Sequence, residues 1–465
     1  MLHGLTPAAI AADIRLAARA SAQAIAARQA ERLQQLLQAA RATPFYARIL
    51  AELAREYPPG CIPLHALPVL TKPELMRNFA DHVTDPQLTL PGLSTFCADP
   101  QRIGHAYLGK YWVWESSGSS GQPATFVQDE RAMVVYDALE ACRRDSPRPW
   151  ARLWDPLYLT ERFAFVGAID GHFASQVSVQ RLRLAQPWLT ARWRSFSILQ
   201  PAKTLVTELN DFAPTILATY PTAAVLLADE VRRGHLRCRP QEIWTGGETL
   251  TPAMRGHIEQ SFGCALRNSY GASEFLPIAW ECGHGQLHVN ADWVQLEPVD
   301  AHYRPVPPGQ TSHTTLLTNL ANHLQPLIRF DLGDRLTVSP PTYPCRCGSA
   351  LPVVQVQGRR DDALSVPGRD GQSVTLLPLA LSTVLEDSAG LFDFQLRQLP
   401  QHGGSTWRLL LGPTAAATRE QRENYRRLLC EFATAQGAAP LHISTQLVAA
   451  LPLGRSGKLK RVIAA

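Results

Sequence analysis

A run of serine and glycine at residues 116 to 121 could hold a phosphate group. The run reads Ser116, Ser117, Gly118, Ser119, Ser120 and Gly121. Glycines let several backbone N–H groups converge on one anion, and serine hydroxyls add further donors. The same composition is typical of a flexible linker or turn. The Gly-Lys-[Ser/Thr] ending of a Walker A loop is absent, because Gln122 stands where its lysine would be. The strand-like Trp112-Val113-Trp114 before the run favours a loop inside a domain.

Four segments that follow this loop combine glycine with charged residues. They are Tyr270-Gly271-Ala272-Ser273-Glu274, Arg329-Phe330-Asp331-Leu332-Gly333-Asp334, Gly358-Arg359-Arg360-Asp361-Asp362 and Pro452-Leu453-Gly454-Arg455-Ser456-Gly457-Lys458. With the loop, the series resembles the adenylate-forming superfamily of acyl-CoA synthetases, and most closely its phenylacetate-CoA ligase branch. Each motif alone is a weak signal, whereas five in order over residues 114 to 458 are specific. Similar N-terminal segments, at 41 to 46 and 67 to 72, extend the resemblance to nearly the whole chain.

The resemblance implies a role for each motif in the transfer of an adenylyl group from ATP to a carboxylate. The loop at 116 to 121 would hold the β- and γ-phosphates, and Glu274 would help to hold Mg²⁺. Asp334 matches the acid that pairs with the ribose hydroxyls, and Arg359 matches the arginine beside them. Lys458 matches a mobile lysine that bridges the substrate carboxylate and phosphate, which suits a compact ammonium on a long stem. Asp361 matches the hinge of the family.

Two departures from the family pattern leave questions open. Gln122 replaces the loop lysine, which weakens any charge contact with the triphosphate. After Asp362 the family usually continues into a segment that helps to form the channel for the thiol acceptor, whereas here residues 363 to 377 differ. The acceptor is therefore either coenzyme A or the pantetheine arm of an acyl carrier protein.

Three cysteines and a histidine could bind zinc. Some members of this ligase branch look as if they carry a structural zinc on a Cys-x₅-His pair and a later Cys-x-Cys. Cys282 and His288 have the first spacing, and Cys345 and Cys347 have the second. Three thiolates and an imidazole suit a closed tetrahedral Zn²⁺ site. Reduced cysteines at a turn are the alternative, and His284 competes with His288 as a ligand.

The elements that must position these residues follow an alternating pattern from about residue 212. The pattern predicts strands over 215–220, 242–245 and 265–270, with helices between them that begin after Tyr220 and at Thr251. This order is typical of a doubly wound α/β fold with a parallel sheet. In such sheets the ligand lies beyond the carboxyl ends of the strands. The residues expected there are Gly247, Glu248, Tyr270, Gly271, Ala272 and Ser273 for the nucleotide, and Tyr220, Trp244 and Gly246 for an aryl ring.

Two domains are predicted, with a boundary in the Gly358–Asp362 motif. Residues 1–360 would form the large ATP- and acid-binding domain, with an amphipathic helix around Leu33 to Ala40 and a small β-rich subdomain, or small barrel, after about residue 285. Residues 361–465 would form a small mobile α+β domain that carries Lys458. A hairpin around residues 392 to 411 and a helix at about 417–436 are expected in it.

Composition and charge give no signal for a nucleic-acid or membrane partner. The net charge of +5 comes from 45 basic and 40 acidic residues without a basic tract, so neither nucleic acid nor a membrane is an expected partner. No apolar segment is long enough to span a bilayer, and a cytoplasmic location is the default. Nine scattered cysteines argue against a disulfide framework. A homodimer is one assembly that the sequence leaves open.

The leading hypothesis from this resemblance is a ligase that uses ATP to activate an aromatic carboxylic acid and transfers the acyl group to a pantetheine thiol. An aryl acid–acyl carrier protein ligase in a biosynthetic pathway is the rival enzyme. A non-catalytic nucleotide-binding protein is the rival of another class, suggested by Gln122 and by the altered segment after Asp362.

Overall fold

The structure is a computed structural model that describes residues 6–58, 60–116, 124–144, 148–155, 160–340, 345–400, 405–415, 418–454 and 458–464. Residues 117–121 of the serine-glycine loop and Gln122 lie outside the described residues, as do residues 455–457 of the last motif.

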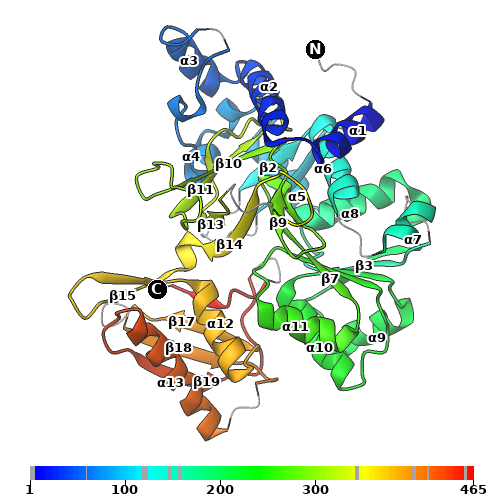
Figure 1. Cartoon of the computed structure of the whole chain (residues 1–465). Helices are drawn as coiled ribbons and strands as arrows, with labels where there is room; N and C mark the ends of the chain where they lie inside the picture. Colours follow the sequence, from blue (N-terminus) through cyan, green and yellow to red (C-terminus); the bar gives the residue numbers. More distant parts are fainter. Residues whose placement is uncertain are drawn as a thin grey trace.

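A nine-stranded sheet forms the centre of the large part of the chain (Figure 1), in the order β13-β14-β9-β8-β7-β6-β5-β3-β4. Its parallel half contains β3 (Phe163–Gly167), β4 (Trp193–Ser197), β5 (Ile216–Thr219), β6 (Glu242–Gly246) and β7 (Ala265–Ala272). Its antiparallel half contains β8 (Phe275–Glu281), β9 (Leu287–Val289), β13 (Asp334–Val338) and β14 (Val353–Arg359). The predicted α/β fold with a doubly wound sheet is therefore confirmed.

Helices cover both faces of the parallel half. One face packs on α9 (Ala202–Phe212), α10 (Pro221–Arg232) and α11 (Pro252–Phe262) through a cluster that includes Leu209, Leu227 and Ile258. The other face carries Phe163 and Ile216 and packs on α8 (Ala174–Ala185), which is followed by η4 (Pro187–Leu189). Helix α11 begins as its sequence predicts, because Thr251 Oγ1 accepts a hydrogen bond from the Met254 N–H.

The N-terminal third is helical. It contains α1 (Pro7–Ala17), α2 (Ala22–Ala40), α3 (Pro44–Leu53), η1 (Leu64–Ala66), α4 (Lys72–Arg77), η2 (Phe79–His82), α5 (Leu90–Cys97), η3 (Pro100–Arg102), α6 (Glu130–Arg143) and α7 (Pro149–Trp154). The predicted amphipathic helix is α2, whose Leu36 and Ala40 are fully buried. Among the helices that the structure describes, none has both the length and the hydropathy needed to cross a membrane.

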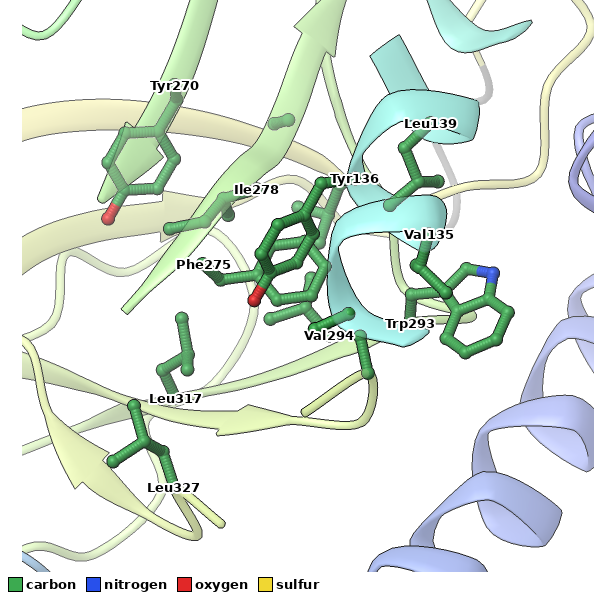
Figure 2. Packing of buried hydrophobic residues seen from close by; sticks show 14 of the residues in the cluster. Val135, Tyr136, Leu139, Tyr270, Phe275, Ile278, Trp293, Val294, Leu317 and Leu327 are labelled. Carbon is green, nitrogen blue, oxygen red and sulfur yellow. The ribbon is translucent and has the colours of Figure 1, made fainter. Parts of the chain in front are cut away.

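The largest hydrophobic core joins α6 to the antiparallel half of the sheet. Tyr136 of α6 lies against Phe275 of β8, with 5.0 Å between ring centres, and Figure 2 shows Val294, Leu317 and Leu327 around them. Val294 and Leu317 belong to a three-stranded sheet of β10 (Val294–Val299), β11 (Thr314–Asn319) and β12 (Phe330–Asp331), and Leu327 lies between β11 and β12. The expected β-rich region is thus present, but β13 and β14 extend the main sheet instead of closing a separate barrel.

The C-terminal part has a hydrophobic core of its own, built from residues between Leu364 and Val462. It contains β15 (Leu364–Pro367), β16 (Ser373–Leu376), α12 (Pro378–Ala389), β17 (Phe394–Gln398), β18 (Thr406–Leu411), α13 (Arg419–Ala435), β19 (His442–Leu447) and β20 (Val462–Ile463). Strands β17 and β18 form the predicted antiparallel hairpin in a sheet of order β19-β18-β17-β20. A short turn, η5 (Arg360–Asp362), joins this part to β14.

Candidate active site

The serine-glycine run connects two strands of one hairpin. Strand β1 (Trp112–Glu115) pairs antiparallel with β2 (Thr125–Gln128), and Glu115 lies opposite Thr125. Ser116 N–H donates to the Ala124 carbonyl over 2.8 Å, and Ala124 N–H donates to Ser116 Oγ over 2.9 Å. Because these bonds pair the residues on either side of the run, the run begins and ends at one hairpin and does not link two domains.

The hairpin is fixed against the segment that contains Glu274. The Trp114 indole N–H donates to the Ser273 carbonyl over 2.8 Å, and the Asn319 amide donates to the Glu274 carbonyl over 2.9 Å. Gly271 lies at an irregularity between β7 and β8, where a Cβ atom would collide with the Leu276 carbonyl. Glycine at this position therefore lets the two strands approach closely just before Glu274.

Asp334 and Arg359 form an ion pair where β13 and β14 meet. The two residues are strand partners, and Arg359 Nη1 lies 3.2 Å from Asp334 Oδ1. Arg359 NH2 also donates to the Leu332 carbonyl over 2.9 Å. The Tyr270 hydroxyl donates to Asp334 Oδ2 over 2.7 Å, and burial raises the pKa of this phenol well above its ordinary value. The structure thus joins the second, third and fourth motifs into one polar cluster.

Lys458 enters this cluster from the C-terminal part. Its ammonium lies 5.4 Å from the centre of the Tyr220 ring, within range of a cation–π contact. Gly247 has a φ of 77°, which favours glycine, and a Cβ atom there would lie 2.9 Å from Lys458 Nζ, so a side chain at this position would displace the ammonium. Burial lowers the pKa of Lys458, with Arg359 acting in the same direction and Glu248 and Asp334 opposing it.

Glu248 holds the lysine segment in place. Its Oε2 accepts hydrogen bonds from the N–H and the hydroxyl of Thr222, over 3.1 and 2.8 Å, near the start of α10. Its Oε1 accepts the Leu459 N–H over 3.0 Å. Burial raises the pKa of Glu248, while the bonds from Thr222 and the charge of Lys458 act against this change. Glu248 therefore connects the turn after β6 to the residue that follows Lys458.

Lys72 is a cation of this cluster that sequence reasoning did not select as a site residue. Burial lowers its pKa, Arg359 lowers it further and Glu274 raises it, so all three groups are close enough to interact. The only signal in the sequence was its position as the last residue of the N-terminal segment at 67 to 72. The cluster thus combines the carboxylates of Glu274 and Asp334 with the cations Lys72, Arg359 and Lys458.

Burial raises the pKa of Glu274 to about 7, with Asp334 adding to the shift and Arg359 and Lys72 opposing it. The folded chain therefore binds this proton more tightly than the unfolded chain does. The resulting stability is complete below the ordinary pKa of 4.5 and is lost as pH rises through about 7.

We expect Glu274→Gln to be more stable than the wild type by about 1–3 kcal/mol above pH 7. This free-energy range is smaller than the full pKa shift would give, because the Glu274 side chain is partly accessible to water. The difference should disappear as pH falls toward 4.5. Denaturant unfolding of both proteins across this pH range is the measurement. Glu52→Gln, on the exposed side of α3, is the control, and a difference that does not vary with pH would contradict the expectation.

The three residues expected near an aryl ring differ in their surroundings. Tyr220 is buried under Lys458, and its hydroxyl accepts the Ala168 N–H over 3.4 Å. Gly246 precedes Gly247 at the end of β6. The Trp244 indole donates to Glu242 over 3.0 Å at the start of the same strand, and the Arg144 guanidinium lies 3.5 Å from its ring centre. Tyr220 and Gly246 therefore adjoin the polar cluster, and Trp244 contacts Glu242 and Arg144, which are not part of it.

Cys282, His288, Cys345 and Cys347 come together at a second site. Their ligand atoms all lie within 4.8 Å of one another. Cys282 Sγ is 3.7 Å from Cys345 Sγ, and Cys347 Sγ is 3.3 Å from His288 Nε2. Ligands about 2.0–2.3 Å from one tetrahedral zinc ion are separated by roughly 3.3–3.8 Å. His288 Nδ1 lies 2.9 Å from the Leu351 carbonyl, which leaves Nε2 toward the sulfur atoms. The donor set and spacing therefore fit a zinc ion, and the described cluster contains His288, not His284.

Comparisons with known proteins agree with these motifs. No family model matches the chain. The chain is 27% identical to protein CapK of Staphylococcus aureus over 167 residues, which cover 35% of each protein. It is 25% identical to a phenylacetate-coenzyme A ligase of Thermus thermophilus over 373 residues, which cover 77% of this chain and 74% of that enzyme. The resemblance predicted from the motifs is thus confirmed.

Solved structures have the same fold, among them one enzyme in two states. It is a 2-hydroxyisobutyryl-CoA ligase in its postadenylation state, which is 20% identical, covers 94% of this chain and 89% of its own, and has a TM-score of 0.68. In its thioesterification state the same enzyme gives a TM-score of 0.55, at 21% identity and with 97% and 91% of the chains covered. Both structures therefore have the fold of this chain.

Proposed function

We infer that this chain, an adenylate-forming ligase of the phenylacetate-CoA ligase-like branch, joins a carboxylic acid to a thiol and converts ATP to AMP and diphosphate. The observation that carries this inference is Lys458, which the C-terminal part inserts beside Gly247 into the cluster of Glu274, Asp334 and Arg359. In the first step a carboxylate oxygen attacks the α-phosphorus of ATP, and diphosphate leaves. In the second step the thiol sulfur attacks the acyl carbon, the thiol loses its proton, and AMP leaves.

Each group in the cluster suits one part of the first step. Lys458 would balance the charge of the carboxylate and of the α-phosphate as they meet, which is electrostatic stabilisation of the transition state. Asp334 can accept hydrogen bonds from ribose hydroxyls, with Arg359 fixing its orientation over 3.2 Å. The loop at 116 to 121 would bind the β- and γ-phosphates through its N–H and hydroxyl groups.

Mg²⁺ fits the carboxylate of Glu274, since this ion prefers oxygen ligands and commonly binds phosphates at the same time. When bound, the ion would neutralise charge on the phosphates. The chain contributes the recess that holds Glu274, where burial keeps part of this group protonated near pH 7 in the absence of a cation.

The substrate that we propose is an aromatic carboxylic acid. Tyr220 lies next to Lys458, so an aryl acid whose carboxylate meets the ammonium could place its ring near the Tyr220 side chain and Gly246. Trp244 stays a prediction for this pocket. Coenzyme A is the proposed acceptor, and an acyl carrier protein is the alternative because residues 363 to 377 differ from the family pattern.

Further proposals concern the domains and the surroundings of the protein. We propose that residues 1–360 and 361–465 are the two domains and that the second rotates about Asp361 between the two steps. A structural zinc ion at Cys282, His288, Cys345 and Cys347 is supported by their distances. A cytoplasmic location, a homodimer and the lack of nucleic-acid or membrane partners stay predictions.

Exchange of labelled diphosphate into ATP, measured with a panel of aryl and fatty acids, tests the proposed function. An aryl acid should support exchange. Addition of coenzyme A, or of a carrier protein with a free pantetheine thiol, should then show which thiol is acylated. Exchange with fatty acids alone would refute the aromatic substrate. If no acid supports exchange while the chain still binds ATP, the non-catalytic nucleotide-binding protein is the better description.

A further inference from the structure

A buried carboxylate lies at the junction of the two parts of the chain. It belongs to Glu386 of α12, whose side chain is fully buried. Glu386 Oε2 accepts a hydrogen bond from the Thr251 hydroxyl, and Oε1 pairs with the Arg461 guanidinium. Thr251 belongs to the large part, and Arg461 follows Lys458 by three residues. Glu386 therefore connects the start of α11 with the segment that carries the lysine.

The Thr251 hydroxyl makes two hydrogen bonds at the same time, one within α11 and one to Glu386. As the N-cap of α11 it accepts the Met254 N–H over 3.2 Å, and it donates its own proton to Glu386. A hydroxyl has one proton to donate and two lone pairs, so both bonds form together. The aligned peptide dipoles at a helix start also favour a nearby carboxylate. The start of α11 is thus a good partner for Glu386.

Other contacts place the same elements side by side. The Phe392 ring, which precedes β17, stacks on His257 of α11 with 5.2 Å between ring centres. Arg461 NH2 donates to the Phe392 carbonyl over 2.6 Å. Figure 1 shows α12 beside α11 at this junction. The lysine segment is therefore held by Glu386 on one side and by Glu248, through the Leu459 N–H, on the other.

We propose that Glu386 is a positioning residue, whose bond to Thr251 across the junction selects the arrangement in which Lys458 lies at Gly247. This rests on the proposed function only in assigning that arrangement to the first step. When the C-terminal part moves away, Thr251 loses a charged acceptor and the Glu386–Arg461 ion pair becomes exposed to water. A hydrogen bond to a charged group is strong enough to shift such a balance by about ten- to a hundredfold.

Two substitutions of Thr251 by side chains of nearly equal shape distinguish its bond to Glu386 from its capping of α11. Asn and Asp both cap helices well, so Thr251→Asn and Thr251→Asp should both keep the start of α11. Asn can also donate an N–H to Glu386. Ionised Asp has no proton to donate, and its charge repels the carboxylate. Thr251→Ser keeps the hydroxyl and is the matched control.

Hydrogen exchange of the Leu459 amide, measured on the full chain without substrates, reports the arrangement directly. We expect exchange about ten- to a hundredfold faster in Thr251→Asp, and near wild-type exchange in the Asn and Ser variants. The first step should slow by a similar factor in the Asp variant alone. Thioester formation from supplied acyl-adenylate should not slow.

Equal exchange in the Asp and Asn variants would overturn the proposal, as would equal slowing of both steps. If no acid is adenylated, the exchange result still decides the role of Glu386, because it needs no substrate. Should Thr251→Asp fail to fold, Glu386→Gln keeps an acceptor for Thr251 and removes the charge. It should then shift exchange in the same direction by a smaller factor, and an unchanged rate would refute the role.

Discussion

Lys458→Ala should reduce acyl-adenylate formation by about 10²–10³-fold, the usual effect of removing one charged or hydrogen-bonding group aimed at a transition state. Its ammonium lies within electrostatic range of Asp334 and Arg359 and reaches this position only through the C-terminal part. The second step should be largely spared, because we propose that the lysine withdraws before the thiol attacks. Diphosphate exchange measures the first step, and thioester formation from supplied acyl-adenylate measures the second.

Two controls make this prediction specific. Lys203→Ala removes an exposed lysine from α9 and should change neither step. Lys458→Arg keeps the positive charge but should not restore the first step, because the larger planar guanidinium does not place its charge where the ammonium lies beside Gly247. Equal loss of both steps in Lys458→Ala would show that the lysine has a different role.

The parts of the site that could be predicted from sequence are those that local rules determine. Alternating apolar runs and capping residues gave β5, α10, β6, α11 and β7 close to their bounds, because caps such as Thr251 act through bonds to residues three positions away. Strand ends in a parallel sheet meet at one edge, which correctly brought Tyr220 and Gly247 together. The order of the motifs indicated the remaining candidate residues, Glu274, Asp334, Arg359 and Lys458.

Contacts between distant positions could not be predicted in this way. Glu248 and Leu459 are 211 positions apart, and nothing in either local sequence indicates that the Glu248 carboxylate accepts a hydrogen bond from the Leu459 N–H. Lys72 reaches the cluster because Leu70 pairs with the third motif, where its N–H donates to the Arg329 carbonyl over 3.1 Å. Strands β13 and β14 were expected in a separate region, yet Val353 of β14 pairs with His288 of β9 and extends the main sheet. Pairing partners of this kind leave no periodic signal.

Zinc content and stability should both depend on the four-residue cluster. We expect the purified chain to carry about one zinc ion, as four ligands at these distances fill a structural site. Cys345→Ser should lose most of this zinc and about 4 kcal/mol of unfolding free energy. That value is the loop-closure estimate for a cross-link between Cys282 and Cys345, which are 63 positions apart. Metal analysis and denaturant unfolding are the measurements.

The choice of histidine gives the sharpest control. His288→Gln should lose zinc as Cys345→Ser does, because His288 Nε2 lies 3.3 Å from Cys347 Sγ. His284→Gln and Cys61→Ser, which alter exposed residues outside the cluster, should keep both zinc and stability. If the chelator-washed wild type contains no zinc and unfolds as before, the cysteines are simply reduced thiols at a turn. If His284→Gln loses the ion and His288→Gln keeps it, the ligand set is wrong by one residue. If Cys345→Ser and His288→Gln lose zinc and the two controls keep it, the ion connects the turn between β8 and β9 to the loop before β14. It then stabilises the antiparallel half of the sheet, on which Asp334 and Arg359 lie.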